Sequence, residues 1–223
     1  MQDVTERAFS ARLDCRYLLR KPEHADEQTA LVVALHGFGG NPEVMLELTA
    51  RLFHPQPVLA SLQGPYQFFR DLGRQEVGYG WVTGKHPAES IRLHHDMVSQ
   101  VLEEAGAEFG IPPARRFLLG FSQSVSLNYR FAATNPDAVR GMIGICGGIP
   151  SDWDTGSYQP VRAALLHIAR KQDEYYSPSV TQQYAERLRK RAADVEFHLI
   201  DGGHHMPSSG SGIVGPWLQR LLS

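Results

Sequence analysis

The chain has 223 residues, 42% of them hydrophobic, and a formal net charge of −2 at pH 7. This length suffices for one full hydrophobic core, and no linker or repeat divides the sequence, so we expect a single domain over residues 1–223. The near-neutral charge offers no general attraction to nucleic acid or anionic membranes, and no apolar run approaches the roughly 20 residues that span a bilayer.

The N-terminal stretch and the cysteines bear on the cellular compartment. Residues 1–7 lack the apolar segment of a secretory signal. Cys15 falls in a predicted N-terminal strand, and Cys146 ends a later apolar run. Two cysteines do not make a disulfide framework, so we expect two buried, reduced thiols in a cytoplasmic protein.

Short apolar runs alternate along the chain with longer amphipathic segments. The apolar runs are predicted to be strands, at 31–35, 58–62, 117–119, 142–146, 164–168 and 195–200. The amphipathic segments are predicted to be helices, at 42–53, 89–109, 123–134, 178–192 and 213–222. Most of the strands are apolar on both faces, which is typical of a parallel sheet covered on both sides. The alternation predicts an α/β fold with right-handed crossovers.

The longest irregular stretch, 63–87, combines glycines with aromatic and charged side chains. A loop of this length in a compact domain is more often functional than accidental. Trp81 within it is our candidate substrate-binding residue; the alternative is that its ring anchors the loop on the core. Because no long apolar insertion could fold as a lid, we expect a partly open, semi-polar cleft.

The segment from Arg116 to Ser124 carries the clearest chemical signal. It is predicted to be a buried strand that turns sharply into a helix. Such a turn exposes Ser122 at the carboxyl end of the sheet, close to a helix N-terminus, and so presents a weak nucleophile for acyl transfer. The expected pattern is G-x-S-x-G, and Ser124 occupies the place of its last glycine.

Partners for a serine nucleophile follow three other predicted strands. Asp173 and Glu174 follow one strand, His204 and His205 follow the last, and a glycine-rich segment at 36–41 follows the strand at 31–35. All these loops fall at the carboxyl ends of parallel strands, where ligands bind in such sheets. We favour Asp173 over Glu174 because a short acid directly after a strand is the usual orienting group, and His204 over His205 as the base.

Other histidines have simpler interpretations. His36, at a strand end, is expected to be a structural residue that orients the glycine-rich loop through hydrogen bonds. The neighbours His94 and His95 lie in a predicted amphipathic helix and are expected on a solvated or half-buried face. A metal site built from His198 with the pair His204 and His205 lacks a convincing carboxylate or cysteine, so we expect no metal.

The sequence resembles the phospholipase/carboxylesterase family of α/β-hydrolases, a small lidless group that includes acyl-protein thioesterases. The resemblance spans about residues 10–222, and its motifs are 35–41, 120–124, Asp173 with Tyr175, Tyr176 and Pro178, and Gly203-His204. It implies a mostly parallel sheet with helices on both faces and no cap domain. It also implies a serine esterase with the triad Ser122, His204 and Asp173, and an oxyanion hole formed by the backbone N–H groups of Phe38 and Gln123.

On this basis we expect hydrolysis of small carboxylic esters with short to medium acyl chains, through an acyl-enzyme and without a cofactor. A thioesterase or small peptidase could use the same triad, because the triad sets the reaction class and not the substrate. A non-catalytic binding protein on the same fold is a further alternative. We expect no nucleic-acid partner and no membrane insertion. The sequence leaves the acyl group, the alcohol and a homodimer open.

Overall fold

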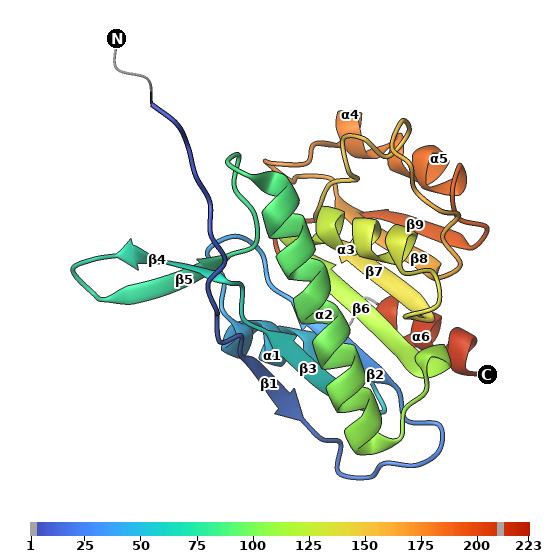
Figure 1. Cartoon of the computed structure of the whole chain (residues 1–223). Helices are drawn as coiled ribbons and strands as arrows, with labels where there is room; N and C mark the ends of the chain where they lie inside the picture. Colours follow the sequence, from blue (N-terminus) through green and yellow to red (C-terminus); the bar gives the residue numbers. More distant parts are fainter. Residues whose placement is uncertain (1–3, 209–211) are drawn as a thin grey trace.

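A seven-stranded sheet forms the centre of the protein, shown in Figure 1 as a computed structural model that describes residues 4–208 and 212–223. Its strands, in the order in which they lie side by side, are β1 (Tyr17–Arg20), β3 (Val58–Leu62), β2 (Leu31–Leu35), β6 (Arg116–Phe121), β7 (Gly141–Ile145), β8 (Ala164–Arg170) and β9 (Val195–Ile200). The edge strand β1 is antiparallel to β3, and every other neighbouring pair in this sheet is parallel.

The strand order reverses at β2, which has β3 on one side and β6 on the other. The chain leaves β2 toward one edge of the sheet and later builds the remaining strands toward the opposite edge. In an open parallel sheet such a reversal leaves a crevice beyond the carboxyl ends of the two central strands, and ligands bind there. The loops that follow β2 and β6 meet at this point.

Helices cover both faces of the sheet (Figure 1). One face packs against α2 (Pro87–Phe109), α3 (Gln123–Thr134) and α5 (Tyr184–Arg189), and the other against α1 (Pro42–Ala50) and α6 (Val214–Leu222). Along β2 the fully buried side chains alternate between these two cores, because successive strand residues point to opposite faces. The predicted α/β architecture is confirmed. None of the helices among the described residues has the length and apolar character that crossing a membrane requires.

Two predicted segments differ from the structure. The irregular stretch 63–87 contains a hairpin of β4 (Tyr66–Asp71) and β5 (Glu76–Gly80), which pairs outside the main sheet. Most positions of β4 are exposed and β5 contains two glycines, so neither strand has the apolar run that marks a core strand. The helix predicted over 178–192 is divided into α4 (Pro178–Thr181) and α5. A short 3₁₀ turn at Pro113–Arg115 leads into β6.

The cysteines occupy different environments. Cys146 is buried and Cys15 is exposed, and both are free thiols. The expectation of two buried thiols is therefore wrong for Cys15. Pairing of β1 with β3 starts at Tyr17, so Cys15 lies before the strand and outside the sheet. Residues 1–3 of the N-terminal stretch considered above lie outside the described residues.

Two histidines are fully buried in the core between the sheet and the helices. His94 of α2 has its Nε2 atom 3.2 Å from Asn128 Oδ1, and His167 of β8 has its Nδ1 atom 2.8 Å from the Tyr129 hydroxyl. The solvated or half-buried position expected for the pair in α2 is therefore wrong for His94 and holds for His95, which is half-buried. Burial lowers the pKa of His94 and of His167 to about 3.

These two histidines predict a loss of stability in mild acid. Below pH 6.5 the unfolded chain protonates both imidazoles while the native protein does not, so the free energy of unfolding falls as the pH falls. We expect a loss of about 2 kcal/mol per histidine between pH 7 and pH 5. Urea denaturation at these pH values measures it. His94→Gln and His167→Gln should each flatten the slope, and a wild-type stability independent of pH over this interval would contradict the assignment.

Candidate active site

Three side chains from separate loops meet at the carboxyl end of the sheet. Ser122 follows β6, Asp173 follows β8 and His204 follows β9. The Nε2 atom of His204 lies 2.9 Å from Ser122 Oγ, and its Nδ1 atom lies 3.0 and 3.1 Å from the two carboxylate oxygens of Asp173. The structure thus brings the three predicted residues into one continuous hydrogen-bonded chain. This is the geometry in which an imidazole takes the proton of an attacking hydroxyl.

Ser122 occupies a strained turn between β6 and α3. Its φ of 57° and ψ of −114° belong to a region that residues with a Cβ rarely adopt. Its N–H donates to the Ile145 carbonyl at 2.9 Å, and its own carbonyl accepts from Val125 N at 3.2 Å. The neighbouring loop approaches closely because Gly37 has no side chain: a Cβ there would lie 3.0 Å from Ser122 Cβ.

Ser124 takes a direct part in holding this turn. Its side chain is fully buried, and its hydroxyl accepts from Phe121 N at 3.1 Å. The same hydroxyl lies 2.9 Å from the carbonyl of Leu35 at the end of β2, to which it donates. The serine in place of the expected glycine therefore links the nucleophile turn to the adjacent central strand.

Asp173 is held as an ion. Its side chain is fully buried, and its Oδ1 atom accepts from the backbone N–H groups of Tyr175 and Tyr176, both at 2.9 Å. Burial alone would raise the pKa of this carboxyl, but the hydrogen bonds from His204 and the two N–H groups outweigh it and leave the pKa below its ordinary value. Glu174 instead reaches the backbone N–H of His204 at 3.3 Å, so Asp173 is the acid that faces the imidazole.

Aromatic rings enclose the His204 imidazole. Tyr175 lies edge-on with ring centroids 4.7 Å apart, and Phe121 lies at 5.0 Å. Only 12% of the His204 side chain is exposed. The neighbouring His205 is exposed, and its Nδ1 atom lies 2.9 Å from the Met206 carbonyl. Of the two adjacent histidines, only His204 contacts Ser122 and Asp173 among the described residues.

The loop after β2 orients one predicted oxyanion donor. His36 accepts from Gly64 N at its Nε2 atom, at 3.0 Å, so its proton is on Nδ1, which donates to the Gly37 carbonyl at 2.7 Å. Gly40 N donates to the same carbonyl at 3.0 Å. A trans peptide points its C=O and N–H in opposite directions, so the N–H of Phe38 is turned away from these bonds. Burial lowers the pKa of His36, and this neutral residue has the structural role expected of it.

The second predicted donor belongs to Gln123, whose side chain is engaged elsewhere. Its Oε1 atom accepts from Trp81 N at 2.9 Å, and its Nε2 atom donates to the Val82 carbonyl at 3.0 Å. Within residues 4–208 and 212–223, neither the Phe38 N–H nor the Gln123 N–H donates a hydrogen bond to the protein. Both N–H groups therefore remain free to donate to a bound molecule.

Trp81 anchors the loop after β5. Its ring is 0% exposed, and its Nε1–H donates to the His36 carbonyl at 2.8 Å. The ring also packs edge-on against His94, with centroids 5.6 Å apart. The candidate role of Trp81 in substrate binding is thus corrected in favour of the anchoring alternative. Through His36 and Gln123, it links the two predicted donor segments.

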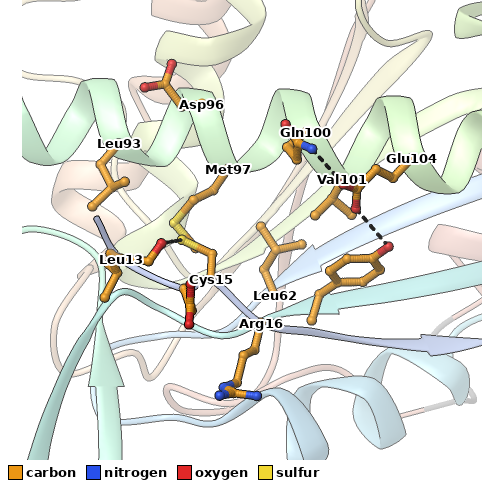
Figure 2. A pocket seen from close by; sticks show the side chains of 12 residues that line it. Leu13, Cys15, Arg16, Leu62, Leu93, Asp96, Met97, Gln100, Val101 and Glu104 are labelled. Atoms are coloured by element: carbon orange, nitrogen blue, oxygen red, sulfur yellow. Dashed lines mark hydrogen bonds between the residues drawn. The ribbon is translucent and has the colours of Figure 1, made fainter. Parts of the chain in front are cut away.

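A cavity of about 170 Å³ lies beside the nucleophile turn. Its walls come from the loop after β2, from α1, from the hairpin and from Phe121 and Met206. The amphipathic pattern of α1 predicted a helix but did not show which of its residues would line a cavity. A larger cavity of about 600 Å³ lies between residues 13–17 and α2, and none of the three hydrogen-bonded residues lines it (Figure 2). Position beside Ser122, and not volume, makes the smaller cavity the candidate substrate pocket.

Cys146 is a buried residue close to both Asp173 and His204. Potential metal-binding atoms of these three residues lie within 4.8 Å of one another. Burial, reinforced by the nearby Asp173 carboxylate, raises the pKa of the Cys146 thiol to about 12. The thiol is thus protonated at neutral pH, and Asp173 and His204 bind each other.

Comparisons with known proteins agree with this architecture. A family model described as Phospholipase/Carboxylesterase matches residues 22–213. A carboxylesterase from Mesorhizobium loti has 22% sequence identity and a TM-score of 0.73 over 93% of this chain and 95% of its own. The Bacillus cereus carboxylesterase has 18% identity and a TM-score of 0.69, with 93% of each chain covered. Zea mays acyl-protein thioesterase 2 has 17% identity and a TM-score of 0.70, over 93% and 99%. No curated protein sequence matches.

The bonds of Ser124 predict a stability effect separate from catalysis. Ser124→Ala leaves the Phe121 N–H and the Leu35 carbonyl without this partner, so we expect the free energy of unfolding to fall by about 1–3 kcal/mol. Ester hydrolysis should stay within a few-fold of wild type, because the hydroxyl points into the protein. Ser126→Ala, in the same helix, is the matched control. Equal stability of the two variants in urea denaturation would argue against the proposed link.

Proposed function

From the membership of this chain in the phospholipase/carboxylesterase family of α/β-hydrolases, a family of esterase-type hydrolases, we propose a specific reaction. The protein cleaves carboxylic esters of short to medium acyl chains. The observation that carries the proposal is the 2.9 Å contact between His204 Nε2 and Ser122 Oγ, with Asp173 on the other side of the imidazole. A small ester is the substrate, and water is the second reactant.

In the proposed mechanism Ser122 Oγ attacks the ester carbonyl carbon while its proton passes to His204 Nε2. The carbonyl oxygen gains the negative charge, and the backbone N–H groups of Phe38 and Gln123 stabilise it. Asp173 holds the imidazole in the required tautomer and stabilises the imidazolium. His204 then returns the proton to the departing alkoxide as the carbon–oxygen bond breaks. Water, deprotonated by His204, attacks the acyl carbon of the acyl-enzyme. The bond to Ser122 Oγ then breaks, His204 returns the proton to Ser122 Oγ, and the acid is released.

A thioester is the second candidate substrate. The same nucleophile, base and oxyanion donors serve a thioester carbonyl, and a structural neighbour is described as an acyl-protein thioesterase. An oxygen ester and a thioester of the same acyl group distinguish the two candidate substrate classes. The catalytic groups are the same for both, and only the leaving group changes. The larger kcat/KM identifies the preferred class.

We also propose that residues 1–223 form one domain in a reducing compartment, the cytoplasm. The continuity of the sheet from β1 to β9 supports the first statement, because a boundary inside it would cut strand pairs. The two free thiols support the second, since Cys15 is exposed and unpaired.

The paired histidines provide a test of the base. His204→Ala removes the proton acceptor, and we expect kcat to fall by about 10⁴- to 10⁶-fold, comparable with Ser122→Ala. His205→Ala changes the adjacent exposed residue and should retain activity within about tenfold. Steady-state hydrolysis of p-nitrophenyl butyrate measures both. An inactive His205→Ala together with an active His204→Ala would mean that the base has been assigned to the wrong histidine.

The cavity beside Ser122 predicts the dependence on acyl length. At about 170 Å³ it is smaller than common ligand pockets, which span roughly 300–1,000 Å³. Each methylene that finds a wall adds about 0.8 kcal/mol, and methylenes beyond the cavity add little. In a p-nitrophenyl ester series from acetate to palmitate, we expect kcat/KM to peak at short to medium chains. A maximum at palmitate would contradict this.

A further inference from the structure

Arg70 occupies an irregular position in the hairpin beside the active site. The pairing of β4 with β5 runs from Tyr66 to Phe69 in regular register and resumes only at Asp71, so Arg70 is the extra residue of a β-bulge. A bulge changes the direction in which a side chain points, and bulges are over-represented next to active sites. Here the side chain is directed across β5 toward the loop after β2.

Two glycines leave room for the Arg70 side chain. A Cβ on Gly78 would lie 2.6 Å from Arg70 Cδ and 2.7 Å from the backbone oxygen of Gly39, so a side chain there would collide with the loop after β2 as well as with the arginine. A Cβ on Gly39 would lie 3.7 Å from Arg70 Cδ and Nε, which places the start of the guanidinium against this loop. Gly39 directly follows Phe38, the proposed oxyanion donor.

The hairpin is fixed to that loop by backbone hydrogen bonds. Gly39 N donates to the Tyr79 carbonyl at 2.8 Å, and Tyr79 N donates to the Gly40 carbonyl at 3.0 Å. The rings of Phe38 and Phe68 stack with centroids 4.9 Å apart. Arg70 is therefore carried on an element that cannot move independently of the oxyanion loop.

Among the described residues that line the two cavities flanking this loop, Arg70 alone carries a formal charge. It lines both the 170 Å³ cavity and a more open one of about 520 Å³, and among the described lining residues neither cavity has an acidic side chain. Asp71, its neighbour in sequence, pairs instead with Arg74 at 3.8 Å. Among residues 4–208 and 212–223, Arg70 forms no ion pair and no side-chain hydrogen bond. A cation in this position attracts an anionic group of the substrate.

The location also indicates which part of the substrate reaches Arg70. The leaving group must lie near His204, because His204 returns the proton to it. Neither His204 nor Asp173 lines the 170 Å³ cavity, whose walls come mainly from the loop after β2 and from α1. Gly37 and Phe121, on its inner wall, adjoin Ser122. We therefore assign this cavity to the acyl side of the scissile bond.

We propose that Arg70 is a specificity-determining residue that binds a carboxylate at the far end of the acyl chain, so that the enzyme prefers monoesters of dicarboxylic acids over esters of simple fatty acids. The planar guanidinium matches a carboxylate through two parallel N–H···O bonds. The inference rests on the function proposed above, since it concerns the acyl pocket of the same site.

The test compares p-nitrophenyl hydrogen adipate with p-nitrophenyl hexanoate. The acyl groups have equal length and differ only in a terminal carboxylate or methyl group, and the shorter succinate and glutarate monoesters are avoided because their carboxylates attack their own esters. We expect wild type to favour the adipate ester by about three- to tenfold in kcat/KM at low salt. Added salt should reduce this ratio, because the ion pair is partly exposed.

Arg70→Met should bring the ratio to about one or below while leaving hydrolysis of the hexanoate ester within about threefold of wild type. Arg70 is exposed, so the substitution leaves the core intact. Arg70→Lys should keep part of the preference. Arg74→Met is the matched control, because it removes the same charge from the same hairpin but lines neither cavity, and it should leave the ratio unchanged.

A wild-type ratio of one or less, or an equal ratio in wild type and Arg70→Met, would overturn the role of Arg70. That outcome is distinct from a failure of the proposed function. If wild type hydrolyses the hexanoate ester and Ser122→Ala does not, the esterase mechanism stands and only the inference about Arg70 falls. If wild type hydrolyses neither ester faster than Ser122→Ala, the proposed function itself fails.

Discussion

The backbone of Ser122 is the constraint on which the candidate site depends. A residue with a Cβ at a φ of 57° and a ψ of −114° costs on the order of 1–3 kcal/mol, and persists only where the surrounding structure holds it. Here the Ser122 N–H is bonded to Ile145 of β7, and the Ser124 hydroxyl bonds the preceding residue and the end of β2. Two neighbouring strands of the sheet thus fix the turn, and the serine hydroxyl projects out of the sheet toward His204.

The same constraint explains the composition of the loops around it. Gly37 and Gly120 both lie close to the turn and to the helix that follows it: a Cβ on Gly37 would lie 3.0 Å from Ser122 Cβ, and one on Gly120 would lie 2.8 Å from Asn128 Nδ2 of α3 and 3.2 Å from Ser124 Oγ. His36 and Trp81 then fix the loop after β2, through the Gly37 carbonyl and the His36 carbonyl. The available N–H of Phe38 follows from this packing.

Much of this arrangement could be predicted from sequence, for a specific physical reason. Strands buried on both faces read as apolar runs, and the order of the sheet brings the loops after them to one edge, so Ser122, Asp173 and His204 could be proposed together. The β4–β5 hairpin could not be predicted, because β4 is mostly exposed and β5 contains two glycines, Gly78 and Gly80, so neither strand has an apolar run. The full burial of Trp81 and His94 does not follow from composition, which does not show whether a polar ring in a loop or helix finds a buried partner. No local sequence pattern indicates the position of Arg70, because the direction of its side chain depends on the β-bulge.

The most direct measurement is the site of covalent modification by a fluorophosphonate, found by peptide mass spectrometry of the treated protein. The account predicts one adduct, on Ser122, formed in wild type and strongly slowed in Asp173→Asn, which keeps the shape of the acid but removes the charge that stabilises the imidazolium. An adduct on another serine would contradict the assignment of the nucleophile. The absence of any adduct, in protein shown to be folded, would contradict the serine hydrolase mechanism as a whole.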